Sequence, residues 1–127
     1  MTVGKDIHAV LLAAGRSERM GRNNKLLLNV DGIPLVRKSA ISIINSNVTS
    51  MTVVTGFDEN KIVNALSGLN VNFVKNINFR EGLSSSLKAG LANITPTPSA
   101  VIICLADMPK IQPEHINQLI EYFDPLK

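Results

Sequence analysis

Residues 7–15 read Ile-His-Ala-Val-Leu-Leu-Ala-Ala-Gly, an apolar run that ends in three small residues. Apolar side chains fall on both faces of this run, which is typical of a central strand in a parallel sheet. The small residues Ala13, Ala14 and Gly15 predict a tight turn directly after the strand. Because they carry almost no side chain, an anionic ligand could approach the backbone amides of this turn closely.

The same kind of run recurs further along the chain. Apolar segments at 51–55, 71–74 and 100–105 alternate with segments of helical periodicity. This alternation predicts an α/β fold: an open, mostly parallel, doubly wound sheet with helices on both faces. Ligands bind such sheets outside the carboxyl ends of the strands. The turn at Ala13, the pair at 55–56 and Asp107 each follow a predicted strand, so we expect them to converge on one edge.

Four helices are expected between and after these strands. Their predicted buried faces are Val36, Ala40 and Ile44; Ile62, Val63 and Leu66; Leu83, Leu87 and Leu91; and Ile116, Leu119, Ile120 and Phe123. Pro34 and Pro113 are typical of a first helical position, Asp58 of a helix cap and Gly68 of a helix end. Residues 29–32, Asn-Val-Asp-Gly, predict a tight turn.

The composition is that of a folded domain. The chain has 127 residues, of which 45% are hydrophobic and 18% charged, enough for one domain with a core of its own. Its apolar runs are too short to span a bilayer and the N-terminus has no signal-peptide pattern, so we expect a cytoplasmic protein without membrane contact. The single cysteine, Cys104, lies inside an apolar run and is expected to be buried and inert. His8 and His115 show no spacing typical of a metal site or a catalytic triad.

Positive charge is concentrated in one loop. Residues 15–25 hold Arg16, Arg19, Arg22 and Lys25 against Glu18, and their excess equals the net charge of +3 of the whole chain. A diffuse basic surface would favour a nucleic acid or a membrane, whereas a single cluster favours a small polyanion such as a nucleotide. Arg19 and Lys25 are the candidates for phosphate contact, because a guanidinium can bind two oxygens and an ammonium acts as a mobile point charge. Arg16 and Arg22 could equally be solvated.

Two common phosphate motifs are absent from the sequence. The Gly15 to Gly21 segment lacks the spacing and the Gly-Lys-Ser/Thr ending of a P-loop, and Gly-x-Gly-x-x-Gly does not occur. These absences disfavour P-loop hydrolysis and dinucleotide redox chemistry.

Two further segments could complete a nucleotide site. Asp107 directly follows a predicted strand, where it is either a turn aspartate or a ligand of Mg²⁺, which typically takes one or two protein carboxylates beside waters and phosphate oxygens. Residues 76–87 place Gly82 and three serines at a predicted helix start. These serines either cap the helix or contact a base or ribose.

Four motifs occur together in this order: Leu-Ala-Ala-Gly-Arg-Ser-Glu-Arg-Met-Gly at 12–21 with Lys25 following, Val-Thr-Gly at 54–56, Asn-Ile-Asn-Phe-Arg-Glu-Gly-Leu-Ser-Ser-Ser-Leu at 76–87, and Leu-Ala-Asp-Met-Pro at 105–109. They cover most of the chain. With these motifs the sequence resembles the molybdenum cofactor nucleotidyltransferases, and within them most closely the cytidylyltransferases.

The resemblance implies a Rossmann-like nucleotidyltransferase domain of the glycosyltransferase-A-like type. Such an enzyme transfers CMP from CTP to molybdopterin and releases pyrophosphate. The implied nucleotide-binding residues are Leu12, Ala13, Ala14, Gly15, Ser17, Thr55, Gly56, Gly82 and Ser86. Arg19 and Lys25 are implied as the catalytic cations and Asp107 as the ligand of Mg²⁺. A transient contact with a molybdoenzyme or chaperone is also implied. Ala14, in place of a glycine, favours cytidylyl over guanylyl transfer.

The sequence departs from the family pattern at several positions. Three residues rather than two separate Gly21 from Lys25, Ala106 replaces a common glycine, and Ile77 replaces a common proline. The relatives continue beyond the position of Lys127, so residues 1–127 are expected to form the N-terminal portion of a single NTP-transferase domain, truncated at its C-terminus. Three alternatives remain open: guanylyl transfer to molybdopterin, transfer to a sugar or isoprenoid phosphate, and a nucleotide-binding module that is inactive as a catalyst.

Overall fold

A four-stranded parallel sheet forms the centre of the computed structural model, which describes residues 6–14, 25–78, 81–92, 94, 100–107 and 112–122. Its strands are β1 (Ile7–Leu12), β4 (Ser50–Thr55), β5 (Asn72–Lys75) and β6 (Ala100–Leu105), and their order in space is β5-β4-β1-β6. Every neighbouring pair in this sheet is parallel. The structure therefore confirms the predicted strands and their parallel arrangement.

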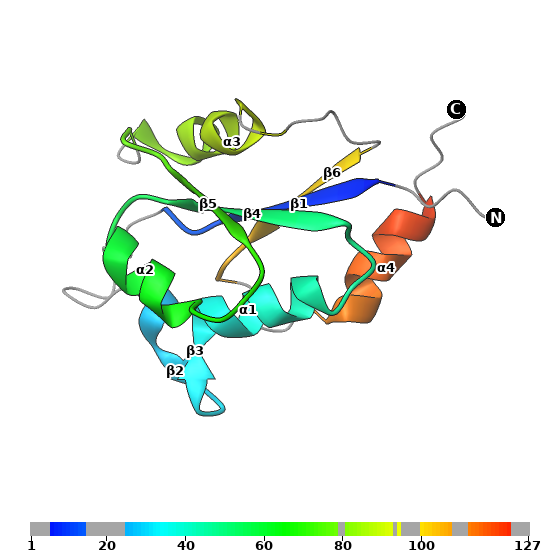
Figure 1. Cartoon of the computed structure of the whole chain (residues 1–127), viewed down its shortest axis with the longest axis horizontal. Helices are drawn as coiled ribbons and strands as arrows, with labels where there is room; N and C mark the ends of the chain where they lie inside the picture. Colours follow the sequence, from blue (N-terminus) through cyan, green and yellow to red (C-terminus); the bar gives the residue numbers. More distant parts are fainter. Residues whose placement is uncertain are drawn as a thin grey trace.

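Helices cover both faces of the sheet, as predicted (Figure 1). Below the sheet in this view lie α1 (Leu35–Ile44), α2 (Glu59–Ala65) and α4 (Pro113–Tyr122), and above it lies α3 (Leu83–Ala92). Alternate side chains of β1 point to opposite faces. Ile7, Ala9 and Leu11 therefore join the larger core cluster with α1, α2 and α4, whereas Val10 and Leu12 join a smaller cluster with Ala14 and Val54 beneath α3. Since all six residues of β1 are buried, this strand is the centre of the core.

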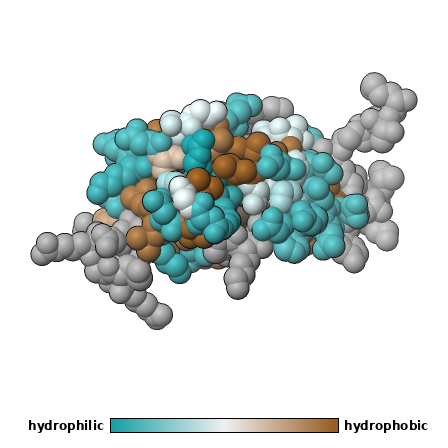
Figure 2. All heavy atoms as spheres, turned by 90° about the horizontal axis from the view of Figure 1, so that it is seen from below, coloured by the Kyte–Doolittle hydropathy of each residue, from teal (hydrophilic) through white to brown (hydrophobic). Residues whose placement is uncertain are grey.

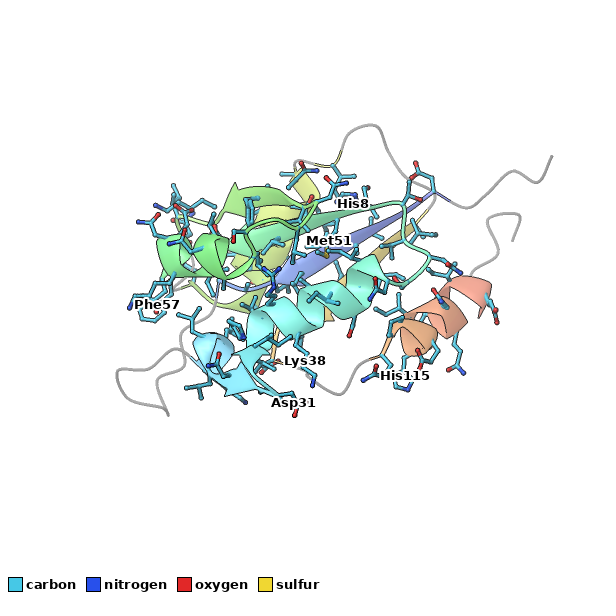
Figure 3. All side chains as sticks on the ribbon, turned by 60° about the horizontal axis from the view of Figure 1, so that its bottom comes forward. His8, Asp31, Lys38, Met51, Phe57 and His115 are labelled. Atoms are coloured by element: carbon cyan, nitrogen blue, oxygen red, sulfur yellow. The ribbon has the colours of Figure 1, made fainter. Side chains whose placement is uncertain are left out.

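A hairpin connects the basic loop to α1. It consists of the 3-10 turn η2 (Lys25–Leu27) and the short strands β2 (Asn29–Val30) and β3 (Ile33–Pro34). Asp31 and Gly32 both have positive φ, 55° and 88°, the backbone that a tight two-residue hairpin turn requires. The Asp31 carboxylate pairs with the ammonium of Lys38 on α1, and this hydrogen bond lowers the pKa of Asp31 (Figure 3). A tight turn is therefore present, one residue later than the predicted 29–32, because Asn29 and Val30 pair as β2 and Asp31 and Gly32 form the centre of the turn.

The helix starts differ in detail from the prediction. Pro34 directly precedes α1 instead of being its first residue. Asp58 directly precedes α2, but it has a left-handed backbone, with φ of 57°, and its carboxylate makes no capping hydrogen bond. In this conformation the side chain does not reach the first amides of the helix. Instead, the far end of α2 is capped from another helix, because the Arg37 guanidinium donates to the carbonyls of Ala65 and Ser67 at 3.1 and 2.9 Å.

The predicted buried face of α3 is wrong. Leu83 and Leu91 are 60% and 44% exposed, and the residues that α3 buries are Ser86 and Gly90. A Cβ atom at position 90 would lie 2.7 Å from Val10 Cγ1 and 2.9 Å from a γ carbon of Val54. The helix therefore approaches the sheet through its smallest residue, and this close contact turns the leucines away from the sheet.

Apolar exposure also occurs elsewhere. Ile44 of α1 was predicted to be buried with Val36 and Ala40 but is 36% exposed, at the end of its helix. Leu119 of α4 was predicted to be buried but is 59% exposed, because Ile116 and Ile120 face the core, while Phe123 lies outside the described residues. On β6, which lies at one edge of the sheet as β5 does at the other, Ile103 and Leu105 are 41% and 38% exposed on the face that carries Val101.

The outer surface of the α1, α2 and α4 layer is mostly polar. Seen from this side, hydrophilic residues cover most of the molecule and apolar residues show between them near the centre (Figure 2). Within the described part of the chain, none of the helices combines the length and the apolar composition that crossing a membrane requires.

The imidazole of His8 on β1 is bonded to side chains of the neighbouring strand β4 (Figure 3). His8 is buried on β1, and its Nδ1 and Nε2 lie 2.6 and 2.8 Å from the hydroxyls of Ser50 and Thr52 on β4. Burial lowers the pKa of His8 below its ordinary value of 6.5, and Asp6 opposes this effect to a smaller extent. His8 is therefore a structural residue held in its neutral form.

We predict that substituting Gly90 with alanine destabilises the protein. Alanine is ordinarily about 1 kcal/mol better than glycine inside a helix, but here its methyl would overlap two β-branched, buried side chains. Overpacking of this kind costs about 1–3 kcal/mol. Urea unfolding should therefore show a net loss of stability for Gly90→Ala and almost no change for Ser84→Ala on the exposed side of α3. A stabilised Gly90→Ala variant would contradict this packing.

We also predict an acid sensitivity that His8 causes. Below pH 6.5 His8 is protonated in the unfolded chain. In the folded protein His8 stays neutral until the pH reaches its lower, folded-state pKa. The contribution of neutral His8 is fully present above pH 6.5 and is lost as the pH falls. Urea unfolding at pH 7.5, 6.5 and 5.5 should show a smaller loss of stability for His8→Gln than for the unchanged protein. Identical pH profiles would refute this role.

Candidate functional site

The carboxyl ends of β1, β4 and β6 are joined by backbone hydrogen bonds. The amide of Ala13 donates to the carbonyl of Val54 at 2.9 Å, and the amide of Ala106 donates to the carbonyl of Leu12 at 3.2 Å. One step further, the amide of Phe57 donates to the carbonyl of Ala14 at 3.2 Å. The predicted convergence of the three strand ends on one edge is therefore present in the structure.

These bonds reduce the number of backbone amides that the predicted phosphate cradle could offer to a ligand. The Leu12 carbonyl and the Ala13 amide are both used within the sheet, and the side chains of Leu12, Ala13 and Ala14 are buried. The amide of Ala13 is therefore not available to a phosphate, a correction to its predicted role that follows from the sheet continuing one residue past β1. A cradle of backbone amides would have to begin at Ala14. Gly15, Ser17 and Arg19 lie outside the described residues.

Lys25 begins the segment that returns from the basic loop. It is exposed, and its carbonyl accepts a hydrogen bond from the amide of Leu28. The carbonyl of Leu28 in turn accepts from the amide of Leu35, the first residue of α1, and η2 packs against α1 and α2. Lys25 thus has an anchored backbone and an exposed ammonium group, which suits contact with an anion.

Asp107 is exposed at the end of β6, but the residue before it is fixed. Ala106 is buried, and its carbonyl accepts a hydrogen bond at 2.9 Å from the hydroxyl of Ser39, a buried residue of α1. Among the described residues, no three His, Cys, Asp or Glu side chains form a group that could hold a metal ion. A metal at Asp107 would therefore need other ligands, such as waters and phosphate oxygens.

Thr55 and Gly56 lie at the end of β4 and are both buried. The Thr55 hydroxyl donates to a carboxylate oxygen of Glu59 at 3.0 Å, and the other oxygen of Glu59 lies 3.9 Å from the ammonium of Lys75. Since Thr55 is 1% exposed, its hydroxyl fixes the start of α2 and does not face solvent. The sequence did not predict that Thr55, Glu59 and Lys75 would be linked by these polar contacts.

Asn76 connects β4, β5 and α3. Its backbone amide donates to the carbonyl of Thr55 at 2.7 Å, and its side-chain amide donates to the hydroxyls of Ser85 and Ser86, both at 3.0 Å. Its side-chain oxygen accepts from the amide of Asn78 at 3.0 Å. The predicted site residue Ser86 is thus buried and bonded to Asn76. No role for Asn76 follows from the 76–87 motif alone, although an asparagine directly after a predicted strand is a recognisable signal.

A cavity of about 590 Å³ lies where β5 ends and α3 begins. It is lined by Lys75, Asn76, Ile77, Asn78, Glu81, Ser84, Ser85, Lys88 and Ala89. Gly82, with φ of +99°, lies in the turn beside it and is exposed. Gly82 directly precedes α3 and Ser86 lies in the first turn of that helix, so the two residues are close together. Ser86 is buried, whereas Gly82 is exposed.

Cys104 agrees with its predicted role. It is partly buried against the larger core cluster, and burial raises the pKa of its thiol to about 11. The thiol is therefore protonated near neutral pH and is a poor nucleophile.

The sequence matches the family model described as "MobA-like NTP transferase domain" over residues 9–127. It is 33% identical over 116 residues to a probable molybdenum cofactor guanylyltransferase from Natronomonas pharaonis, an alignment that covers 91% of this chain and 56% of that protein.

Solved structures give the same result for the fold. A nucleotidyl transferase from Methanothermobacter thermautotroptrophicus, Mth528, superimposes with a TM-score of 0.87 at 29% identity, covering 95% of this chain and 59% of that one. Rv0371c from Mycobacterium tuberculosis shares the fold, with a TM-score of 0.83 at 23% identity over 94% of this chain and 61% of that one, and has also been solved in complex with manganese. The chain thus spans just over half the length of these relatives.

We predict that Asn76→Ala weakens the connection between β5 and α3. The substitution leaves the buried Ser86 hydroxyl without its partner, which costs about 1–3 kcal/mol, and removes the hydrogen bond to the amide of the exposed Asn78. Urea unfolding should show a loss in this range. Asn72→Ala, an exposed position on β5, is the control and should change stability by less than about 0.5 kcal/mol. Equal effects of the two substitutions would contradict the role of Asn76.

Proposed function

Because the chain belongs to the MobA-like NTP transferase family, we propose that it binds a nucleoside triphosphate at the carboxyl edge of the sheet and transfers the nucleotide to a phosphate-bearing acceptor. The observation that carries this proposal is the hydrogen-bonded junction of three strand ends, in which the residues that lead into the basic loop lie beside Ala106, the residue that precedes Asp107. Ligands of open parallel sheets bind at such a junction.

The residues of this edge suit the proposed roles. Backbone amides from Ala14 onward, including Gly15 and Ser17, would bind the phosphates, and Arg19 and Lys25 would neutralise them. Gly56 and Gly82 would lie along the nucleotide. The buried hydroxyls of Thr55 and Ser86 would act indirectly, by fixing the backbone around it, since each is bonded within the protein.

The chemistry needs no nucleophilic side chain. An oxygen of the acceptor phosphate attacks the α-phosphorus of the triphosphate, a new P–O bond forms, and the bond between the α-phosphorus and the bridging oxygen breaks with release of pyrophosphate. Two anions must be brought together, so the protein contributes positioning and positive charge. The exposed side chain of Lys25, together with the arginines of the basic loop, would supply that charge.

A divalent metal ion is compatible with these residues. Nucleotidyltransferases of this family commonly use one, and we propose Mg²⁺. A single exposed carboxylate at Asp107 suits an ion that also takes phosphate oxygens and waters, whereas it would not hold a metal by itself. When bound, the ion would offset negative charge on the triphosphate.

For the substrates we propose CTP and molybdopterin. Guanylyl transfer from GTP is the second candidate, and the name of the N. pharaonis relative favours it. The methyl of Ala14 packs with Val10, Leu12 and Val54. A preference for CTP would therefore have to arise from the altered backbone of the turn and not from contact between this methyl and the base.

The test is to measure pyrophosphate release from CTP and from GTP with molybdopterin as the acceptor. Release with CTP supports the proposal, and release with GTP alone supports the second candidate. Pyrophosphate release only with a sugar phosphate or an isoprenoid phosphate would show that this compound, and not molybdopterin, is the acceptor. Binding of nucleotide without release under any of these conditions would show a binding module and overturn the proposed transfer.

We predict that Asp107→Asn and Lys25→Ala each reduce turnover, or nucleotide affinity where there is no turnover, by about 100-fold. Both side chains are exposed, so unfolding curves should stay unchanged. Lys61→Ala, an exposed lysine on α2, serves as the control for the loss of one positive charge. If Lys61→Ala reduces activity as much as Lys25→Ala, general electrostatics would explain the effect and the specific role of Lys25 would be refuted.

A further inference from the structure

Ser39 makes a contact that packing of α1 does not require. It lies on the buried face of α1 together with Leu35, Val36, Ala40 and Ile43, and its hydroxyl donates to the carbonyl of Ala106, 67 residues further along the chain. We propose that Ser39 is a positioning residue for Asp107, and that it holds the carboxylate where a nucleotide-bound metal ion can reach it. This inference rests on the proposed function of Asp107.

The physical link is the planarity of the peptide bond. The carbonyl of Ala106 and the amide nitrogen of Asp107 belong to one rigid unit, so fixing the carbonyl also fixes the direction in which the chain enters Asp107. Asp107 is the first exposed residue after this unit. A hydrogen bond to the carbonyl of the preceding residue is therefore the closest control that a buried side chain can exert on it.

The backbone amide of Ala106 is fixed as well as its carbonyl. Its amide donates to the carbonyl of Leu12, so both polar backbone groups of this buried residue are bonded, one to β1 and one to α1. β6 itself ends at Leu105. With Ser39 removed, the peptide before Ala106 would stay bonded to Leu12, but the peptide between Ala106 and Asp107 would lose the hydrogen bond to its carbonyl, and this buried carbonyl would have to turn to find another donor.

The role predicts an effect on metal-dependent binding in particular. Partners that orient a metal ligand typically change metal affinity by about 10-fold or more when they are removed. A serine that merely stabilised α1 would lower the melting temperature and leave the metal dependence unchanged. The useful quantity is the ratio of the nucleotide dissociation constant in EDTA to that in Mg²⁺, measured on the full chain by calorimetry.

CTP and GTP are both titrated, and the one that binds the unchanged protein more tightly is used for the variants. Ser39→Ala should lower the ratio about 10-fold, with nucleotide binding in EDTA unchanged. Ser39→Thr, which keeps the hydroxyl, should retain most of the ratio. Ser42→Ala, another buried serine of α1, is the matched control and should leave the ratio unchanged. If Ser39→Ala does not fold, Ser39→Cys takes its place.

Asp107→Asn separates the two possible failures. If Asp107→Asn abolishes the metal dependence but Ser39→Ala and Ser39→Cys do not change it, the positioning role is refuted while the proposed function stands. If Asp107→Asn has no effect on the ratio, or if the unchanged protein shows no metal dependence, the proposed role of Asp107 fails, and the inference fails with it. A loss with Ser42→Ala equal to that with Ser39→Ala would also refute the positioning role.

Discussion

The course of the chain out of β1 depends on the backbone hydrogen bonds that flank its end. The Leu12 carbonyl accepts from Ala106 on one side, and the Ala13 amide donates to Val54 on the other. The sheet pattern thus continues one residue past the strand, in a region where water does not reach the backbone. Because buried amides and carbonyls require partners, the direction in which the chain enters the basic loop is fixed before the loop begins. The segments that follow β4 and β6 start from the same junction.

Several parts of this arrangement could be predicted from the sequence. A strand in the middle of a parallel sheet carries apolar side chains on both faces, and residues 7–12 have this pattern apart from His8. Residues 100–105 have the same apolar pattern, although they form a strand at the edge of the sheet. Parallel strands with helical crossovers bring their carboxyl ends to one edge, so the convergence of the Ala13 turn, Thr55 and the segment before Asp107 followed from the order of elements. The positive φ of Asp31 and Gly32 likewise follows from residue types that tolerate it.

Other parts could not be predicted, because they depend on contacts between residues far apart in the sequence. The leucine spacing of α3 suggested a buried stripe, but the depth of its contact with the sheet is set by Gly90 against Val10 and Val54. A serine on α1 gives no sign that it will meet the carbonyl of Ala106. Nor does sequence spacing show that the Ala13 amide bonds within the sheet, which removes it from the predicted cradle. Side-chain periodicity identifies faces, whereas backbone pairing decides which polar groups are left for a ligand.

The edge position of β6 has a consequence for the behaviour of the protein in solution. Within the described residues this strand has a neighbour only at β1, and it exposes Ile103 and Leu105 beside its open backbone. A partly apolar edge strand is a template on which other chains can add. We therefore expect this short strip to contribute to self-association in concentrated samples.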